Sequence, residues 1–248
     1  MRSSKVPEVT LAFWLIKIAA TTLGETGGDA LSMTLRLGYA LSSLIFIAFL
    51  IVTAAAQIRA RRFHPFLYWA VIVATTTAGT TMADFADRSL GIGYVGGSLI
   101  LFALVMGVLG LWRLSMGSVS VDHISSPGVE AFYWATILFS NTLGTALGDF
   151  LADSGGLGFE GGALVFGAAL ALIAGAFYFT RVSRTLLFWS AFILTRPLGA
   201  TLGDLLTKPH SMGGLHLSRI GSSSWLALFM VACILLVPWR AGARAPQR

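Results

Sequence analysis

The sequence WLIKIAATTLGETGGD at residues 14–29 contains the pattern on which the whole chain is built. Its tryptophan, the glycine ten residues later and the aspartate five residues after that recur three times, in WAVIVATTTAGTTMAD at 69–84, WATILFSNTLGTALGD at 134–149 and WSAFILTRPLGATLGD at 189–204. Successive glycines of this W-x9-G-x4-D pattern are 55, 65 and 55 residues apart. Self-similarity at such a spacing indicates four tandem structural repeats.

The composition identifies the class of protein. Of the 248 residues, 56% are hydrophobic and 11% are charged, and the mean hydropathy is +0.79. These values exclude an ordinary water-soluble domain, whose charged fraction is about 25%. The net charge of +6 comes from basic residues in short loops between apolar runs, which is typical of membrane topology and not of a nucleic-acid partner. The one cysteine, Cys233, lies in an apolar run, so no disulfide framework is expected.

Apolar runs of about 20 residues, the length of a helix that crosses a bilayer, occur throughout the chain. Backbone polar groups in lipid must be paired within their own segment, so runs of this length are helices. We predict an all-α integral membrane protein that forms a single domain over 1–248. Its eight predicted transmembrane helices are 9–30, 38–57, 65–86, 93–112, 129–151, 159–180, 185–206 and 220–238.

Each repeat contains two of these spans, so all odd-numbered spans enter the membrane from the same side. We therefore predict four parallel helical hairpins around an axis along the membrane normal. Their approximate bounds are 7–57, 63–112, 128–180 and 183–238. Lysine and arginine are concentrated on the side of both termini, which predicts that this side is cytoplasmic. The first span shows no cleavage site, so we expect it to be retained.

The four repeats also carry a resemblance. With stretches such as TTLGETGGD at 21–29 and NTLGTALGD at 141–149, the sequence resembles an uncharacterised bacterial family of multi-pass membrane proteins built from four tandem two-helix repeats with a tryptophan. The resemblance covers nearly the whole chain. It implies a protein of the bacterial inner membrane with eight spans, and it implies no particular activity. Function is therefore argued from the residues.

The aspartate of each repeat is predicted to lie inside the membrane. It follows the tryptophan by 15 residues, which is about 22 Å of helix rise, and a bilayer core is about 30 Å thick. With the tryptophan at the cytoplasmic interface, each carboxylate falls about 8 Å short of the opposite boundary. Charged groups at such a depth usually face the interior of a bundle or a water-filled cavity.

Polar residues at helical spacing extend this face. The residues seven and four positions before each aspartate lie on the same side of the helix as the aspartate. In the first three repeats these positions hold Glu25 and a set of threonines, which we interpret as lining a pathway: Thr22, Thr77, Thr80, Thr142 and Thr145.

Three of these helices also carry a second acidic residue three or four positions from the aspartate. Paired carboxylates in a medium of low dielectric constant repel each other unless a proton or a cation lies between them. All the available ligand atoms are oxygens, which suit Mn²⁺, Mg²⁺ or Ca²⁺. The predicted metal ligands are Asp29, Asp84, Asp149, Asp204, Glu25, Asp87 and Asp153.

The fourth repeat differs from the others. Pro197 and Ala200 replace threonines, and Arg196 lies about 10 Å past the interfacial tryptophan. A buried arginine needs a partner, and the predicted one is Glu25. The pair is either a counter-charge that substitutes for metal or proton during transport, or a structural ion pair. Lys17 is expected to extend to the cytoplasmic interface and to have no role.

Two weaker signals concern the loops. Glycine clusters at 91–96 and 156–161 fit the G-x-G-x2-G expression of a dinucleotide site, but they lie between membrane spans and not in a βαβ unit. We interpret them as tight reversals and expect no nucleotide. His210 and His216, in the last outer loop, either extend the metal preference toward softer ions or simply contact water.

Together these features predict a transporter and not an enzyme. The expected substrate is a divalent metal cation, moved by proton-coupled export or exchange through the acidic site. The expected partners are the lipid bilayer, the metal cation and protons, with no nucleic acid. Two alternatives stay open: a cation-selective channel with an acidic ring, and an intramembrane enzyme or scaffold in which the acids are catalytic or hold helices together.

Overall fold

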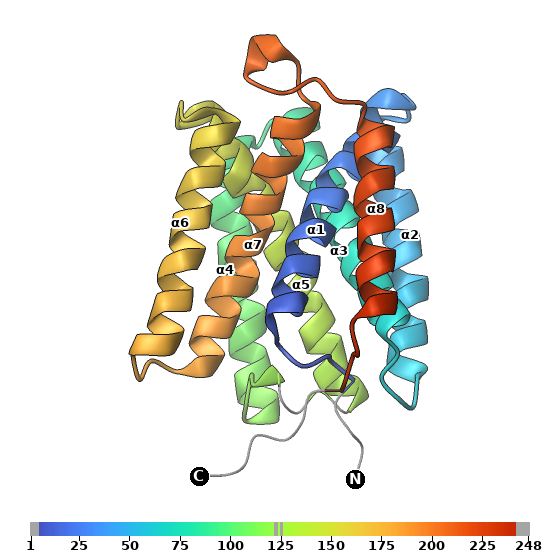
Figure 1. The fold of residues 1–248 in the computed structure, drawn as a ribbon, viewed down its shortest axis with the longest axis vertical. Coiled ribbons are helices and arrows are strands. Elements are labelled where there is room, and N and C mark those ends of the chain that lie inside the picture. The colour runs from blue at the N-terminus through green and yellow to red at the C-terminus, as the bar shows by residue number, and fades with distance from the viewer. Residues whose placement is uncertain (1–4, 122–123, 125, 242–248) are drawn as a thin grey trace.

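The computed structural model describes residues 5–121, 124 and 126–241. Within these residues, eight long α-helices run lengthwise through one bundle and alternate in direction (Figure 1). Each helix lies within a few residues of a predicted span. The helices are α1 (Leu11–Asp29), α2 (Gly38–Arg59), α3 (Pro65–Asp84), α4 (Gly93–Met116), α5 (Pro127–Asp149), α6 (Gly158–Phe179), α7 (Arg184–Thr207) and α8 (Arg219–Leu236).

The first helix of each repeat begins at a recognisable signal. The Thr10 hydroxyl accepts a hydrogen bond from the N–H of Phe13 at 3.3 Å, which caps α1. Ser126 and Ser183 cap α5 and α7 in the same way. Helix α3 starts with Pro65, whose fixed φ and missing N–H suit the first helical position.

The odd-numbered helices form a closed inner ring. Helix α1 packs on α3, α3 on α5, α5 on α7, and α7 returns to α1. The even-numbered helices lie outside this ring, where α2 packs on α3, α4 on α5, α6 on α7 and α8 on α1 (Figure 1). The second helix of a repeat thus packs on the first helix of the next repeat. This packing differs from the predicted hairpins, in which the two helices of one repeat would pack on each other. Helix α2 packs on α3, whereas the main neighbours of α1 are α3, α7 and α8.

Inner and outer helices bury different residues. The inner helices bury polar side chains such as Asn141 and Glu25, whereas the outer helices expose large apolar ones. Leu44, Leu99 and Leu172 are 64%, 66% and 75% exposed. An apolar outside and a polar inside are expected for a protein surrounded by lipid.

Six of the helices in the described residues are long and apolar enough to cross a membrane: α2, α3, α4, α6, α7 and α8. The two that are not in this set, α1 and α5, belong to the inner ring. Helix α1 carries Lys17, Glu25 and Asp29, all of them buried. The protein is therefore a membrane protein in which the charged side chains of α1 are buried inside the bundle.

The connections after three of the four inner helices follow one plan, whereas α7 continues past Asp204 to Thr207. Helices α1, α3 and α5 each end at the repeat aspartate and continue as one π-helical turn, over Ala30–Thr34, Phe85–Ser89 and Phe150–Ser154. The chain then reverses through residues with positive φ, such as Gly91 at 71° and Gly93 at 75°. The described residues contain no β-strand before these glycines. The glycine clusters are therefore reversals, as predicted.

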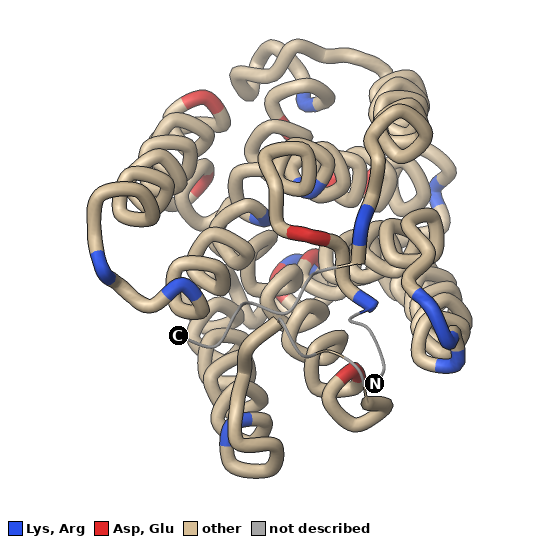
Figure 2. Tube along the Cα trace, turned by 60° about the horizontal axis from the view of Figure 1, so that its bottom comes forward, with Lys and Arg blue, Asp and Glu red and all other residues tan. Residues whose placement is uncertain are grey.

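Charges lie both at the ends of the bundle and inside it. Figure 2 shows several Lys and Arg segments at the loops of the end that comes forward, with an Asp or Glu segment among them. Red and blue segments lie close together further inside the bundle (Figure 2). The interior charges belong to the inner helices and to the loop that follows α7.

Candidate functional site

The glycine of each repeat makes the contact that holds the inner ring together. Gly24 packs on Thr76 of α3, and the equivalent contact recurs around the ring until Gly199 packs on Thr21 of α1. A Cβ atom on Gly199 would lie 2.8 Å from the carbonyl carbon of Thr21, so a larger residue does not fit. The Thr76 hydroxyl donates to the carbonyl oxygen of Ala20 at 3.1 Å. The small-residue positions are therefore sites of close helix packing.

The residue three positions before each of these glycines lies inside the ring. These residues are Thr21, Thr76, Asn141 and Arg196, and all are fully buried. The same repeat position thus holds three neutral polar side chains and one charged side chain. Because the four repeats have equivalent backbones at this position, the arginine of the fourth repeat lies where the others have a neutral side chain. The positive charge of Arg196 is therefore inside the ring.

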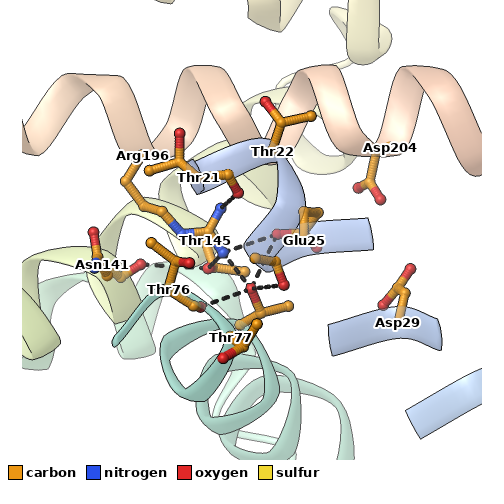
Figure 3. Close-up of polar contacts among 12 residues, drawn as sticks. Thr21, Thr22, Glu25, Asp29, Thr76, Thr77, Asn141, Thr145, Arg196 and Asp204 are labelled. Carbon is orange, nitrogen blue, oxygen red and sulfur yellow. Dashed lines mark hydrogen bonds and ion pairs between the residues drawn. The ribbon is translucent and has the colours of Figure 1, made fainter. Parts of the chain in front are cut away.

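Arg196 is held by residues from the other three repeats. Its Nη2 lies 2.9 Å from Oε2 of Glu25 on α1. The same nitrogen donates to the Thr145 hydroxyl of α5 at 2.7 Å and to the Thr80 hydroxyl of α3. Nη1 donates to the carbonyl oxygen of Thr21 at 3.4 Å. Figure 3 shows the side chains of Glu25 and Thr145 turned toward the guanidinium. Glu25 is the partner that the sequence predicts, and Thr80 and Thr145 are acceptors for the same group.

Lys17 does not extend to the interface, so that prediction is wrong. Its side chain is fully buried, and Nζ lies 3.5 Å from Oδ1 of Asn141 and 4.1 Å from the ring centroid of Phe192. Lys17 is seven residues before Gly24, and seven residues are close to two helical turns. It therefore shares the inward face of α1 with Thr21.

The four repeat aspartates form two bridged pairs. Arg88 lies between Asp84 and Asp149, with Nε 2.9 Å from Oδ1 of the first and Nη2 3.2 Å from Oδ2 of the second. Lys208 lies between Asp29 and Asp204, with Nζ 3.1 Å from Oδ2 of the first and 3.1 Å from Oδ1 of the second. Each basic residue therefore joins aspartates of two neighbouring repeats.

The basic residues at this level were not predicted from the sequence. Arg88 and Lys208 each follow a repeat aspartate by four residues, and that spacing was the available signal. Burial alone would lower the pKa of Lys208, but the attraction of Asp204 and then of Asp29 outweighs it and raises that pKa. Lys208 is thus a cation at neutral pH. Arg219 adds a further positive charge, with Nε 3.5 Å from Oδ2 of Asp29.

Three of the predicted metal ligands converge. Glu25, Asp29 and Asp204 each offer a carboxylate oxygen, and these oxygens lie within 4.8 Å of one another. All three side chains are buried, and Oδ1 of Asp29 has no hydrogen-bond partner among the described residues. We call these residues the acidic triad. Figure 3 shows Asp29 and Asp204 beside the Arg196 cluster, with Glu25 between. Buried oxygens at this spacing are suitable ligands for a hard cation.

The other predicted ligands lie elsewhere. Asp84 and Asp149 share Arg88 and do not belong to the triad. Asp87 packs against Gly97 of α4, close enough to exclude a Cβ there. Asp153 is exposed and accepts a hydrogen bond from the Tyr94 hydroxyl at 3.3 Å.

The remaining predicted residues have local contacts. The hydroxyls of Thr22, Thr77 and Thr142 each donate to the carbonyl oxygen four residues earlier in the same helix, at 3.0, 2.9 and 2.9 Å. The rings of His210 and His216 have their centroids 5.9 Å apart on the exposed loop after α7. Neither histidine belongs to the triad.

Comparison with known proteins agrees with the internal repeats. The family described as Repeat of Unknown Function (DUF347) matches four times in tandem, at residues 12–63, 67–118, 132–183 and 187–242. These bounds lie within a few residues of the predicted repeats. No curated protein and no solved structure matches the chain. The chain is therefore a member of the DUF347 repeat family, with four copies that form the inner and outer rings described above.

Proposed function

We propose that this protein is a membrane transporter for a divalent cation, and that the cation binds at the acidic triad. The observation that carries the proposal is the approach of carboxylate oxygens of Glu25, Asp29 and Asp204 to within 4.8 Å of one another in a buried place. Arg196, Lys208 and Arg219 balance part of the negative charge of these carboxylates. Oδ1 of Asp29 has no hydrogen-bond partner among the described residues, which leaves a buried oxygen free to bind a cation. Oxygen ligands favour Mn²⁺, Mg²⁺ or Ca²⁺.

All eight helices cross the membrane in this proposal. The polar faces of α1 and α5 are turned into the inner ring, as the burial of Lys17 and Asn141 supports. The repeats are then parallel around an axis along the membrane normal. The bacterial inner membrane is the proposed location. Basic residues in the loops of the end where the odd-numbered helices begin support cytoplasmic termini.

Proton-coupled exchange follows from the same groups. A carboxylate that releases a metal ion in a site of low dielectric constant gains a proton easily, so metal and proton alternate at the triad. Arg196 remains beside Glu25 throughout, because its guanidinium is held by three repeats. Its charge reduces the net negative charge of the triad and makes release of the cation easier.

An acidic-ring channel is the less favoured alternative. Arg196 and Lys17 are both fully buried within the inner ring. A continuous cation pathway along that ring would pass the positive charge of Arg196, which raises the barrier to a cation. A transporter requires only that the triad be reached from one side at a time, so it accommodates these residues.

The test is cation flux into proteoliposomes. Purified protein is reconstituted with a metal-sensitive dye inside the vesicles, and uptake of Mn²⁺, Ca²⁺, Mg²⁺ and K⁺ is followed at several pH values. We expect saturable, pH-dependent uptake of at least one divalent ion. Asp29→Asn and Asp204→Asn should abolish it. The matched control is Asp153→Asn, since Asp153 is an exposed acidic residue outside the triad.

Other outcomes distinguish the alternatives. Uptake that rises linearly with concentration and carries an ohmic current would favour the channel. The absence of flux for every ion, or flux that Asp29→Asn and Asp204→Asn leave intact, would contradict transport at the triad. In that case an enzyme or a scaffold is the better reading.

A further inference from the structure

The position of Lys208 suggests how the acidic triad is controlled. Lys208 comes directly after α7, and its side chain is 7% exposed. Its Nζ lies 3.1 Å from Asp29 and 3.1 Å from Asp204, which supply two of the three triad carboxylates. The ammonium group of Lys208 therefore neutralises two carboxylates that would be ligands of a metal ion at the triad.

We propose that Lys208 is a tethered cation that occupies the acidic triad in the resting state and must withdraw when a divalent cation binds. This inference rests on the proposed function, because it concerns the same three carboxylates. An ammonium group and a divalent ion repel each other, and each gains most of its stabilisation from Asp29 and Asp204. Binding of one is thus linked to departure of the other, and the linkage is reciprocal.

The backbone around Lys208 is fixed, so withdrawal is a movement of the side chain. The N–H of Lys208 donates to the carbonyl oxygen of Asp204 at 2.8 Å, and its own carbonyl oxygen accepts from the N–H of His216 at 2.9 Å. Gly214 packs directly against this backbone, where a Cβ would not fit. The flexible four-carbon stem of lysine allows the ammonium to leave without any change in the loop.

The other bridging residue provides the contrast. Arg88 joins Asp84 and Asp149 in the same manner, but among the described residues no third carboxylate oxygen lies within 4.8 Å of both. The repeat position of Glu25 is occupied there by Thr80 and Thr145. A guanidinium also makes a forked contact with its carboxylates, whereas an ammonium is a point charge. The Arg88 pair is therefore a stable clamp, and only the Lys208 pair adjoins a site for a second cation.

Amine labelling tests the proposal on the unmodified protein. The chain contains three lysines, Lys5, Lys17 and Lys208, and all are buried. Purified protein is treated with an N-hydroxysuccinimide ester at increasing Mn²⁺ concentration, and the labelling of each lysine is measured by mass spectrometry. We expect the rate at Lys208 to rise about tenfold or more at saturating Mn²⁺. Labelling of Lys5 and Lys17 should not change.

Binding to a variant provides an independent measurement. Lys208→Met removes the charge and keeps a similar length, so the Kd for Mn²⁺, measured from the electron paramagnetic resonance of the free ion, should fall about tenfold or more. Lys208→Arg should bind Mn²⁺ no more tightly than the unmodified protein does. The matched control is Lys17→Met, the same substitution at a buried lysine that contacts Asn141 and Phe192 and not the triad, which should leave the Kd within about twofold. Size-exclusion profiles identify any variant that fails to fold, and the labelling result then decides alone.

The outcomes separate the two proposals. If the unmodified protein and Lys208→Met both fail to bind Mn²⁺, Ca²⁺ and Mg²⁺, the proposed function is contradicted. If the unmodified protein binds Mn²⁺ at the triad, but Lys208 labelling stays constant and Lys208→Met binds no more tightly, the tethered-cation inference is wrong while the proposed function stands.

Discussion

Nη2 of Arg196 on α7 lies 2.9 Å from Oε2 of Glu25 on α1, so a buried ion pair joins the last repeat to the first. It is one of several contacts between α7 and α1 that close the inner ring, together with the packing of Gly199 on Thr21. The pair is also next to the acidic triad, because Glu25 belongs to both. Ring closure and the candidate site therefore share one carboxylate.

The closing pair should be sensitive to the loss of one partner. Arg196→Met leaves the Glu25 carboxylate buried without its cation, which costs about 3–5 kcal/mol. We expect a marked fall in the midpoint of thermal unfolding in detergent. Removing both charges, in Arg196→Met with Glu25→Met, should restore most of the loss, since an apolar pair is tolerated in such a place. A double variant as unstable as the single one would contradict this account of the pair.

The ring glycines should not tolerate even a methyl group. A Cβ on Gly199 would lie 2.5 Å from Cβ of Thr21, so Gly199→Ala should destabilise the protein by about 1–3 kcal/mol. The control is Gly167→Ala on the outer helix α6, where a Cβ would meet nothing within 4 Å. That change should be neutral or slightly stabilising, because alanine is the better helix former. Thermal unfolding of the two variants measures the difference, and equal effects would argue against close packing at Gly199.

A hydrogen bond between two buried tyrosines should be measurable by a double-mutant cycle. The hydroxyl oxygens of Tyr68 and Tyr133 are 2.7 Å apart, and both side chains are fully buried. Tyr68→Phe leaves the Tyr133 hydroxyl without this partner, which costs about 1–3 kcal/mol. Adding Tyr133→Phe should recover part of that loss. Additive losses in thermal unfolding would show that the two hydroxyls do not stabilise each other.

Lys17 should cost stability. Its ammonium is fully buried with one acceptor at 3.5 Å, an arrangement that compensates little of the lost hydration. Lys17→Met should therefore increase the free energy of unfolding by about 1 kcal/mol or more, which would appear as a higher midpoint of thermal unfolding. The same variant in the flux assay shows whether Lys17 takes part in transport. A lower unfolding midpoint would mean that the contacts with Asn141 and Phe192 are net stabilising.

The repeat pattern predicts much of this fold because it records which residues approach one another. The four glycines that define it are the points where the inner helices touch. Arg196 breaks the repeat, and it contacts Glu25, the one acidic residue among the equivalent repeat positions 25, 80, 145 and 200. Positions of helices and loops follow from the apolar runs and from glycines such as Gly91.

The helix pairing and the contacts of the buried charges depend on how the repeats pack on one another, and the repeat pattern gives no information about that packing. The pattern is the same whether α2 packs on α1 or on α3, so the displaced pairing was not predicted. The prediction for Lys17 uses its short distance along the helix from the interfacial Trp14. It does not use the direction in which the side chain points, which is toward the inside of the ring. Lys208 and Arg88 lie four residues after Asp204 and Asp84, a spacing typical of ion pairs on one helix face. The repeat pattern does not show that each also contacts an aspartate of a second repeat.

The proposed transport function requires that Glu25, Asp29 and Asp204 bind a cation. Anomalous X-ray scattering from crystals soaked in Mn²⁺ tests this binding directly. We predict an anomalous peak between the three carboxylates, with the Lys208 ammonium displaced from Asp29 and Asp204. A peak only elsewhere, or none at Mn²⁺ concentrations that saturate uptake, would contradict the account.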